Sequence, residues 1–221
     1  MFDTAAAGSV SPLFIAGVGF AGVCLGLLSD ALIRRALPQL AGEASIRLKT
    51  ATAAVTFALS ALLAWRFGIA AELPAYVLLG LVAVPLARID IAHHLLPNRL
   101  VGPLLGAGLV LLSSAAFSHG AAGNLYRGVA GSVILFVSYL ILALTSRNGL
   151  GMGDVKLAAP LGLYLGYLGW SQLFYGGALA FVAGGLASVF LVLKNRENKP
   201  KEVAYGPSML AAGLAIILLI P

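Results

Sequence analysis

The chain has 221 residues, of which 60% are hydrophobic and only 10% are charged, and its mean hydropathy is +0.99. A soluble domain carries about 25% charged residues, so this composition excludes a soluble fold and predicts a chain that lies mostly in a lipid bilayer. The formal net charge of +6 does not indicate nucleic-acid binding, because the basic residues are scattered at segment ends rather than clustered.

Hydropathy predicts an all-α, polytopic membrane protein with about eight transmembrane helices in one domain, because about 20 apolar residues make one crossing. We expect the spans near residues 12–33, 51–70, 73–92, 98–117, 125–145, 152–169, 171–193 and 204–220. The first is expected to be a retained helix rather than a cleaved signal peptide, since Asp3 precedes it and Arg34 and Arg35 follow it.

The sixth span differs from the others in polarity. Its apolar character is diluted by Asp154, Lys156, Pro160 and several glycines. This pattern favours a broken or tilted helix that lines a polar cavity. At its far end, Tyr164, Tyr167 and Trp170 are typical of an aromatic belt at a membrane interface, and we assign them no chemistry.

The distribution of Lys and Arg predicts the orientation of the chain, because cytoplasmic connections are enriched in these residues. Only Arg66 and Arg127 fall on one side. The other side collects twelve: Arg34, Arg35, Arg47, Lys49, Arg88, Arg99, Arg147, Lys156, Lys194, Arg196, Lys199 and Lys201. Both termini should therefore face outward, and the polar stretch from Lys194 to Lys201 should be a cytoplasmic loop. A docking site for a substrate or for anionic lipid head groups is the alternative for that loop.

Three of the eight acidic residues, Asp30, Asp90 and Asp154, fall inside predicted spans. A carboxylate at membrane depth is costly unless it is protonated, paired or facing a wet cavity, so each is a candidate functional residue. Asp30 lies one helical turn before Arg34, which favours a local ion pair. Asp90 and Asp154 both fall at the predicted cytoplasmic ends of their spans.

Asp90 belongs to Arg88-Ile-Asp-Ile-Ala-His-His-Leu-Leu-Pro-Asn98. On a continuing helix, Asp90, His93, His94 and Pro97 would share one face, and Pro97 and Asn98 suit the turn into the next span. The histidines are interpreted as interfacial polar residues, with tuning of Asp90, substrate contact or metal binding as alternatives.

Asp154 belongs to Gly149-Leu-Gly-Met-Gly-Asp-Val-Lys156. The glycines let backbone approach closely and expose the carboxylate without bulky neighbours. A glycine-rich turn capped by aspartate at a helix start is the alternative interpretation. Lys156 is explained by topology as a cytoplasmic anchor, although its charge could also act on Asp154.

Two carboxylates on separate helices at one depth are what an aspartyl protease requires. One ionised carboxylate activates water while its protonated neighbour polarises the peptide carbonyl, and like charges at close range enforce this division. Neither a metal nor a cofactor is needed. A membrane transporter or channel component is the rival interpretation, because intramembrane carboxylates and broken helices also mark ion pathways.

These motifs resemble the type IV prepilin peptidases and the archaeal preflagellin peptidases, which belong to the GxGD group of aspartyl proteases. The resemblance rests on Asp90 followed by Pro97-Asn98, and on Gly151-Met-Gly-Asp-Val-Lys156. It extends to three further segments: Gly26 to Pro38, Ala158 to Gly166, and Glu202-Val-Ala-Tyr-Gly-Pro207.

The resemblance implies that Asp90 and Asp154 are catalytic, with Gly151, Gly153, Lys156, Pro97 and Asn98 in supporting positions. It implies removal of the short basic leader from prepilins or pseudopilins, whose N-terminal hydrophobic helix enters from the bilayer, at the cytoplasmic face of the inner membrane. The implied partners are these substrates and membrane lipid, without nucleic acid.

The chain departs from the bifunctional bacterial members of that family in one respect. Those members carry a large loop after the first helix, with paired Cys-x-x-Cys motifs that bind zinc, whereas this sequence has the single cysteine Cys24. Residues 1–50 are therefore interpreted as a reduced remnant of the methyltransferase region, and N-methylation with S-adenosylmethionine is not carried over. Presenilin-like proteases fit less well, since they pair a tyrosine with the first aspartate, where this chain has Ile89.

Overall fold

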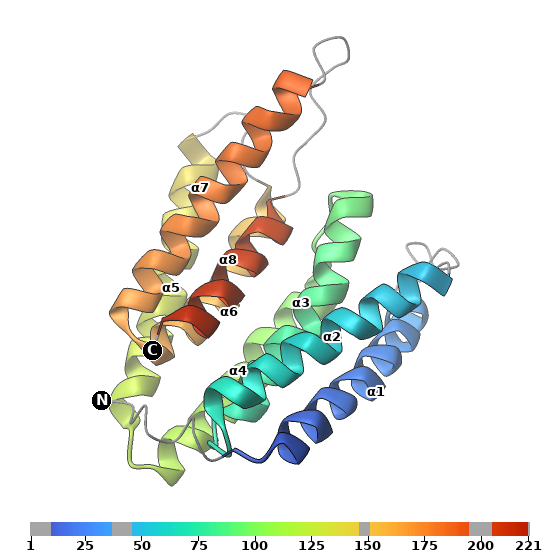
Figure 1. The fold of residues 1–221 in the computed structure, drawn as a ribbon. Helices are drawn as coiled ribbons and strands as arrows, with labels where there is room; N and C mark the ends of the chain where they lie inside the picture. The colour runs from blue at the N-terminus through green and yellow to red at the C-terminus, as the bar shows by residue number, and fades with distance from the viewer. Residues whose placement is uncertain (1–9, 37–45, 146–150, 195–204, 221) are drawn as a thin grey trace.

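The computed structural model describes residues 10–36, 46–145, 151–194 and 205–220, with side chains except at 29–36 and 187–194. These residues form eight α-helices and no strand (Figure 1), so the predicted all-α fold is confirmed. The helices are α1 (Pro12–Ala36), α2 (Ile46–Phe67), α3 (Leu73–His93), α4 (Asn98–Ser118), α5 (Ala122–Thr145), α6 (Met152–Leu168), α7 (Trp170–Lys194) and α8 (Gly206–Leu219).

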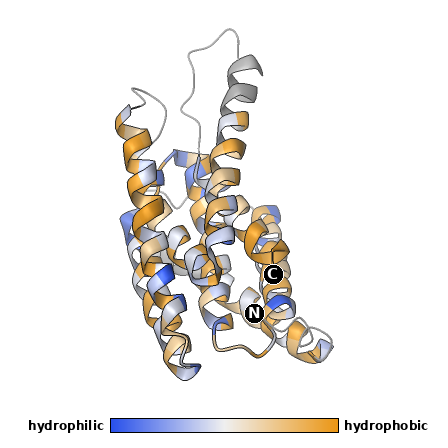
Figure 2. Cartoon of the chain, turned by 90° about the vertical axis from the view of Figure 1, so that its left-hand side faces the viewer, coloured by the Kyte–Doolittle hydropathy of each residue, from blue (hydrophilic) through white to orange (hydrophobic). Residues whose placement is uncertain are grey.

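Four of these helices, α2 to α5, are long and apolar enough to cross a membrane, and the described parts of α1 and α8 are shorter apolar helices. Apolar residues run along most of the length of the helices (Figure 2). The chain thus has several membrane-crossing helices, while the expected number of eight crossings and the outward termini stay predictions.

The helices form two groups that meet at α3, α4, α6 and α8. In one group α1 packs against α2 and α2 against α3; in the other α5 packs against α6 and α7 against α8 (Figure 1). The groups are joined because α3 contacts α8 and α4 contacts α6. The helices that carry Asp90 and Asp154 therefore both border α8, which contacts α3 and α6.

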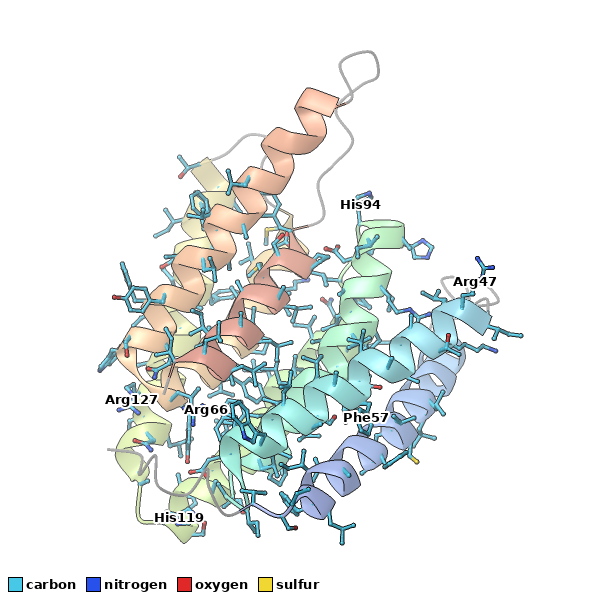
Figure 3. The ribbon with its side chains drawn as sticks, in the orientation of Figure 1. Arg47, Phe57, Arg66, His94, His119 and Arg127 are labelled. Carbon is cyan, nitrogen blue, oxygen red and sulfur yellow. The ribbon has the colours of Figure 1, made fainter. Side chains whose placement is uncertain are left out.

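The chain alternates between two ends of the molecule. Arg47 and His94 lie at one end, and Arg66, His119 and Arg127 lie at the other (Figure 3). Arg66 donates a hydrogen bond to the Ile220 carbonyl just after α8, at 3.3 Å. Arg47 is thus separated from Arg66 and Arg127, as the distribution of Lys and Arg predicts.

Close helix packing depends on glycine at the α5–α6 contact. A Cβ on Gly162 would collide with the backbone oxygen of Gly131, and a Cβ on Gly166 would lie 2.7 Å from the backbone oxygen of Arg127. Backbone atoms cannot move aside as a flexible side chain can. Small residues of this kind let helices approach closely in a membrane, where association relies on packing rather than on water exclusion.

The predicted break in the sixth span and the predicted belt positions of Tyr164 and Tyr167 are wrong. α6 is one continuous helix despite Pro160, and nearly all of its side chains are buried in protein. Tyr164 and Tyr167 are fully buried rather than interfacial, and only Trp170, 56% exposed, is placed as an aromatic belt requires. The error arose because the hydropathy of a segment shows where the segment is polar. It does not show which other helices pack around that segment.

The hydroxyl groups of two core tyrosines, Tyr76 and Tyr164, form hydrogen bonds with backbone carbonyls. The Tyr76 hydroxyl donates to the Tyr164 carbonyl at 2.9 Å, and the Tyr164 hydroxyl donates to the Leu104 carbonyl at 3.4 Å. These bonds tie α3 to α6 and α6 to α4. They explain how phenolic groups are tolerated in the interior, where an unpaired polar atom is costly.

Candidate active site

Asp90 lies in the last turn of α3 and is only 4% exposed. Its backbone oxygen accepts a hydrogen bond from the His94 N–H at 2.8 Å, and His94 has the left-handed conformation, with φ of 51°. This conformation ends the helix. The expected continuous face of Asp90, His93, His94 and Pro97 is therefore wrong, because the helix stops before Pro97 and both histidines are exposed.

The short connection after His94 brings the chain into α4. Pro97 is the N-cap of α4 in an extended conformation, and α4 begins at Asn98. The turn predicted at Pro97 and Asn98 is thus confirmed. Proline suits this position because its fixed φ is compatible with the start of a helix and its missing N–H is not needed there.

The Asp90 carboxylate is bound by the beginning of α8. The backbone N–H of Gly206, the first residue of that helix, donates to Asp90 Oδ2 at 3.0 Å. A Cβ on Gly206 would lie 2.6 Å from the same oxygen, so glycine is required for this close approach. His94 also interacts electrostatically with Asp90.

Asp154 is the third residue of α6 and is 6% exposed. Gly151 is the N-cap residue, and its backbone forms a hydrogen bond with the Asp154 carboxylate. A carboxylate that reaches back to the N-cap amide in this way is one half of a capping box. Asp154 therefore also stabilises the start of α6, although the N-cap residue is Gly151.

The two carboxylates come together at the junction of three helix ends. Asp90 and Asp154 interact electrostatically, although 64 positions separate them in the sequence. Leu96 connects their surroundings: a Cβ on Gly153 would lie 3.0 Å from Leu96 Cβ, and a Cβ on Gly206 would lie 3.4 Å from Leu96 Cδ1. The residue before Asp154 and the residue bound to Asp90 thus pack on one side chain.

The supporting residues expected from the sequence lie around this junction. Lys156 Nζ donates to Asn98 Oδ1 at 3.1 Å, which links the first turn of α6 to the first residue of α4. Tyr139 of α5 donates from its hydroxyl to the Gly177 carbonyl at 3.3 Å and also interacts electrostatically with Asp154. Lys156 therefore contacts Asn98 in a solvent-exposed position.

Sequence reasoning missed three residues of the site: Leu96, Tyr139 and Gly206. Leu96 carries no chemical group that would single it out, and Gly206 was noted only as part of the segment from Glu202 to Pro207. No local pattern could have paired Gly206 with Asp90, which lies 116 positions away. Some residues singled out in the sequence lie outside the described residues: Asp3, Arg147, Gly149, Glu202 and the stretch 195–201, together with the side chains of Asp30, Arg34, Arg35 and Lys194.

The chemistry available at this junction is that of a carboxylate pair. Among the described side chains, no group of three or more His, Cys, Asp or Glu residues could hold a metal ion. Two buried carboxyl groups that interact with each other tend to hold one proton between them, because ionising both places like charges in a poorly solvated site. Such a pair supplies a base and an acid together.

Comparison with known proteins identifies the family to which this site belongs. The type IV leader peptidase family matches residues 76–189, just over half of the chain, and this range includes Asp90 and Asp154. The chain belongs to the type IV leader peptidase family. Within it, leader peptidase HopD of Escherichia coli is 32% identical over 149 residues, which cover 66% of this chain and 93% of that protein.

Larger members of the leader peptidase family match as well. The prepilin leader peptidase/N-methyltransferase of Stutzerimonas stutzeri is 32% identical over 161 residues, covering 72% of this chain and 54% of that protein. Its counterpart in Pseudomonas aeruginosa is 33% identical over 164 residues, covering 74% and 55%. The chain thus spans about half the length of these two relatives. No solved structure matches it significantly.

Proposed function

We propose that this leader peptidase family member is a membrane aspartyl endopeptidase that removes the basic leader from type IV prepilins or pseudopilins. The observation that carries the proposal is the meeting of Asp90 and Asp154, two buried carboxylates from separate helices that interact electrostatically. Buried charge of one sign is unfavourable for stability, so a pair of this kind is more economically explained by chemistry than by packing.

The proposed reaction uses the pair as a base and an acid. The ionised carboxylate accepts a proton from a water molecule, whose oxygen attacks the carbonyl carbon of the scissile peptide bond. The protonated carboxyl donates a hydrogen bond to the carbonyl oxygen and stabilises the charge that develops there. When the intermediate collapses, the C–N bond breaks and the leaving nitrogen takes a proton from the pair.

The proposed substrate follows from the relatives and from the position of the pair. Relatives are named prepilin leader peptidases. Asp90 and Asp154 lie near helix ends rather than in the middle of their helices. A substrate whose hydrophobic helix lies in the bilayer would place a polar leader junction at such a depth. The site would then face the cytoplasm at the inner membrane. N-methylation is not part of the proposal.

The test is processing of a purified type IV prepilin by the full chain in liposomes. D90N and D154N should each lower the rate of leader removal by about 10²–10⁴-fold, because each removes one partner of an acid–base pair. The matched control is D3N, which changes an aspartate that precedes the first helix in the sequence. This variant should process the prepilin at the native rate. Native processing by D90N or D154N would contradict the proposal, as would ion flux without any processing by the native chain.

A further inference from the structure

The environment of Asp90 contains opposing electrostatic influences. Asp90 lies in the last turn of α3, where the helix dipole presents its negative end and disfavours an anion. Asp154 of α6 adds a like charge. The Gly206 N–H acts in the opposite direction, since it donates to Asp90 Oδ2 at 3.0 Å from the first residue of α8.

The beginning of α8 is well suited to compensate the end of α3. The first N–H groups of a helix have no partner within it, and the dipole of that helix favours negative charge at this end. Pro207 follows Gly206 and has no N–H, so Gly206 supplies the donor at the very start of the helix. An amide that binds a carboxylate directly also fixes its orientation.

Other polar groups near Asp90 are placed differently. His94, at the end of the same helix, is exposed and interacts with Asp90 electrostatically. Arg88, two residues earlier on α3, donates to Thr52 Oγ1 of α2 at 3.1 Å. From α4, Asn98 is bound to Lys156 of α6. Gly206 is thus the group from α8 that holds the Asp90 carboxylate.

We propose that Gly206 is a positioning residue, whose backbone amide at the start of α8 orients the Asp90 carboxylate and favours its ionised form. The role requires glycine, because a Cβ would lie 2.6 Å from Oδ2 and 3.1 Å from Cγ of Asp90 and would push the carboxylate off the amide. The inference deepens the proposed peptidase function and rests on it for its catalytic meaning. The final helix thereby completes a site whose two acids are contributed by α3 and α6.

The first test measures Asp90 without measuring activity. In a D154N background, the protonated-carboxyl band of Asp90 is titrated by infrared difference spectroscopy in liposomes, with D90N/D154N as the subtracted baseline. Adding G206A should move the Asp90 midpoint to higher pH by about 1 to 2 pH units, because a hydrogen bond to the charged form is lost.

The matched control is G213A, a second glycine of α8, where a Cβ would meet only the side-chain Cδ2 of Leu161, at 3.0 Å. G213A/D154N should leave the Asp90 midpoint unchanged. If crowding prevents G206A from folding, the additional change L96A provides room for the carboxylate to move. The Asp90 midpoint of L96A/G206A/D154N should then still lie at higher pH than that of L96A/D154N. An unchanged midpoint in folded G206A/D154N overturns the inference.

The second test measures catalysis on the prepilin. G206A should lower kcat at least about tenfold, leave KM within about twofold, and move the acidic limb of the kcat profile to higher pH. G213A should change none of these. A native kcat profile in G206A overturns the inference while D90N and D154N still test the proposed function. A shifted infrared midpoint in a chain that processes no prepilin supports the role of Gly206 and contradicts the peptidase.

Discussion

At its C-terminal end α6 is capped by Arg127 of α5, whereas at its N-terminal end the charged residue, Asp154, faces a second carboxylate. The Arg127 guanidinium donates to the Gly166, Tyr167 and Leu168 carbonyls at 2.8, 2.8 and 3.0 Å. These carbonyls belong to the last turn of the helix, where backbone oxygens have no partner within it. A positive charge there also complements the helix dipole.

The N-terminal end obeys the same rule but adds a conflict. Asp154 is a negative charge in the first turn of α6 and binds the Gly151 backbone, so it too complements the dipole. Asp154 also has Asp90 as a neighbour, however, and the two carboxylates repel each other when both are ionised. The comparison teaches that a charged residue at a helix end indicates function when its remaining neighbour opposes it, and stability when every neighbour is complementary.

The largest effect is expected from D154N, which should separate activity from stability. Prepilin processing should fall by about 10²–10⁴-fold, while the free energy of unfolding should stay the same or rise by about 1 kcal/mol, because asparagine removes the repulsion from Asp90. Processing assays and unfolding in mild detergent measure the two quantities. A loss of stability as large as that of R127A would show that Asp154 is primarily structural.

The next effect is expected from R127A, the corresponding change at the other end of α6. The free energy of unfolding should fall by about 2–4 kcal/mol, since several carbonyls lose a charged donor. Processing by the folded variant should stay within about twofold of native. R66A, which removes the hydrogen bond to the Ile220 carbonyl, is the control and should lower the free energy of unfolding by less. Equal losses in R127A and R66A would contradict the capping role.

A smaller effect is expected from Y76F within the core. The hydroxyl of Tyr76 ties α3 to the Tyr164 carbonyl of α6, and its removal should lower the free energy of unfolding by about 1 kcal/mol. The same change at Tyr126, which is 76% exposed, should have no measurable effect. A comparison of the two unfolding curves decides this, and coincident curves would show that the bond contributes nothing.

The smallest effect is expected from K156A, which breaks the exposed hydrogen bond to Asn98. Stability should change by about 0.5 kcal/mol or less, as for most surface substitutions. Processing should stay within about threefold of native, and N98A should behave in the same way because it removes the other partner. A loss of processing as large as that of D154N would place Lys156 in the chemistry rather than beside it.

The two carboxylates and the turn of the site could be predicted from the local sequence, but the residues that contact them from other helices could not. Asp90 and Asp154 were recognisable because a carboxylate within an apolar span is costly wherever the helix lies. The turn at Pro97 and Asn98 was equally readable, since proline acts on its own backbone. Gly206 was not, because its role depends on a contact with a residue 116 positions away. The same limit explains why Tyr164 and Tyr167 were misplaced.

The sequence by itself determined that the chain is helical, apolar and divided into segments, and which acidic residues lie within them. These properties follow from composition and short-range periodicity, which act through the solvent and the nearest turns of backbone. Only the tertiary structure decided that the start of α8 lies beside Asp90, that Leu96 packs beside Gly153 and Gly206, and that Arg127 caps α6. Such contacts depend on how separate helices are placed in space, which no single segment of the chain specifies.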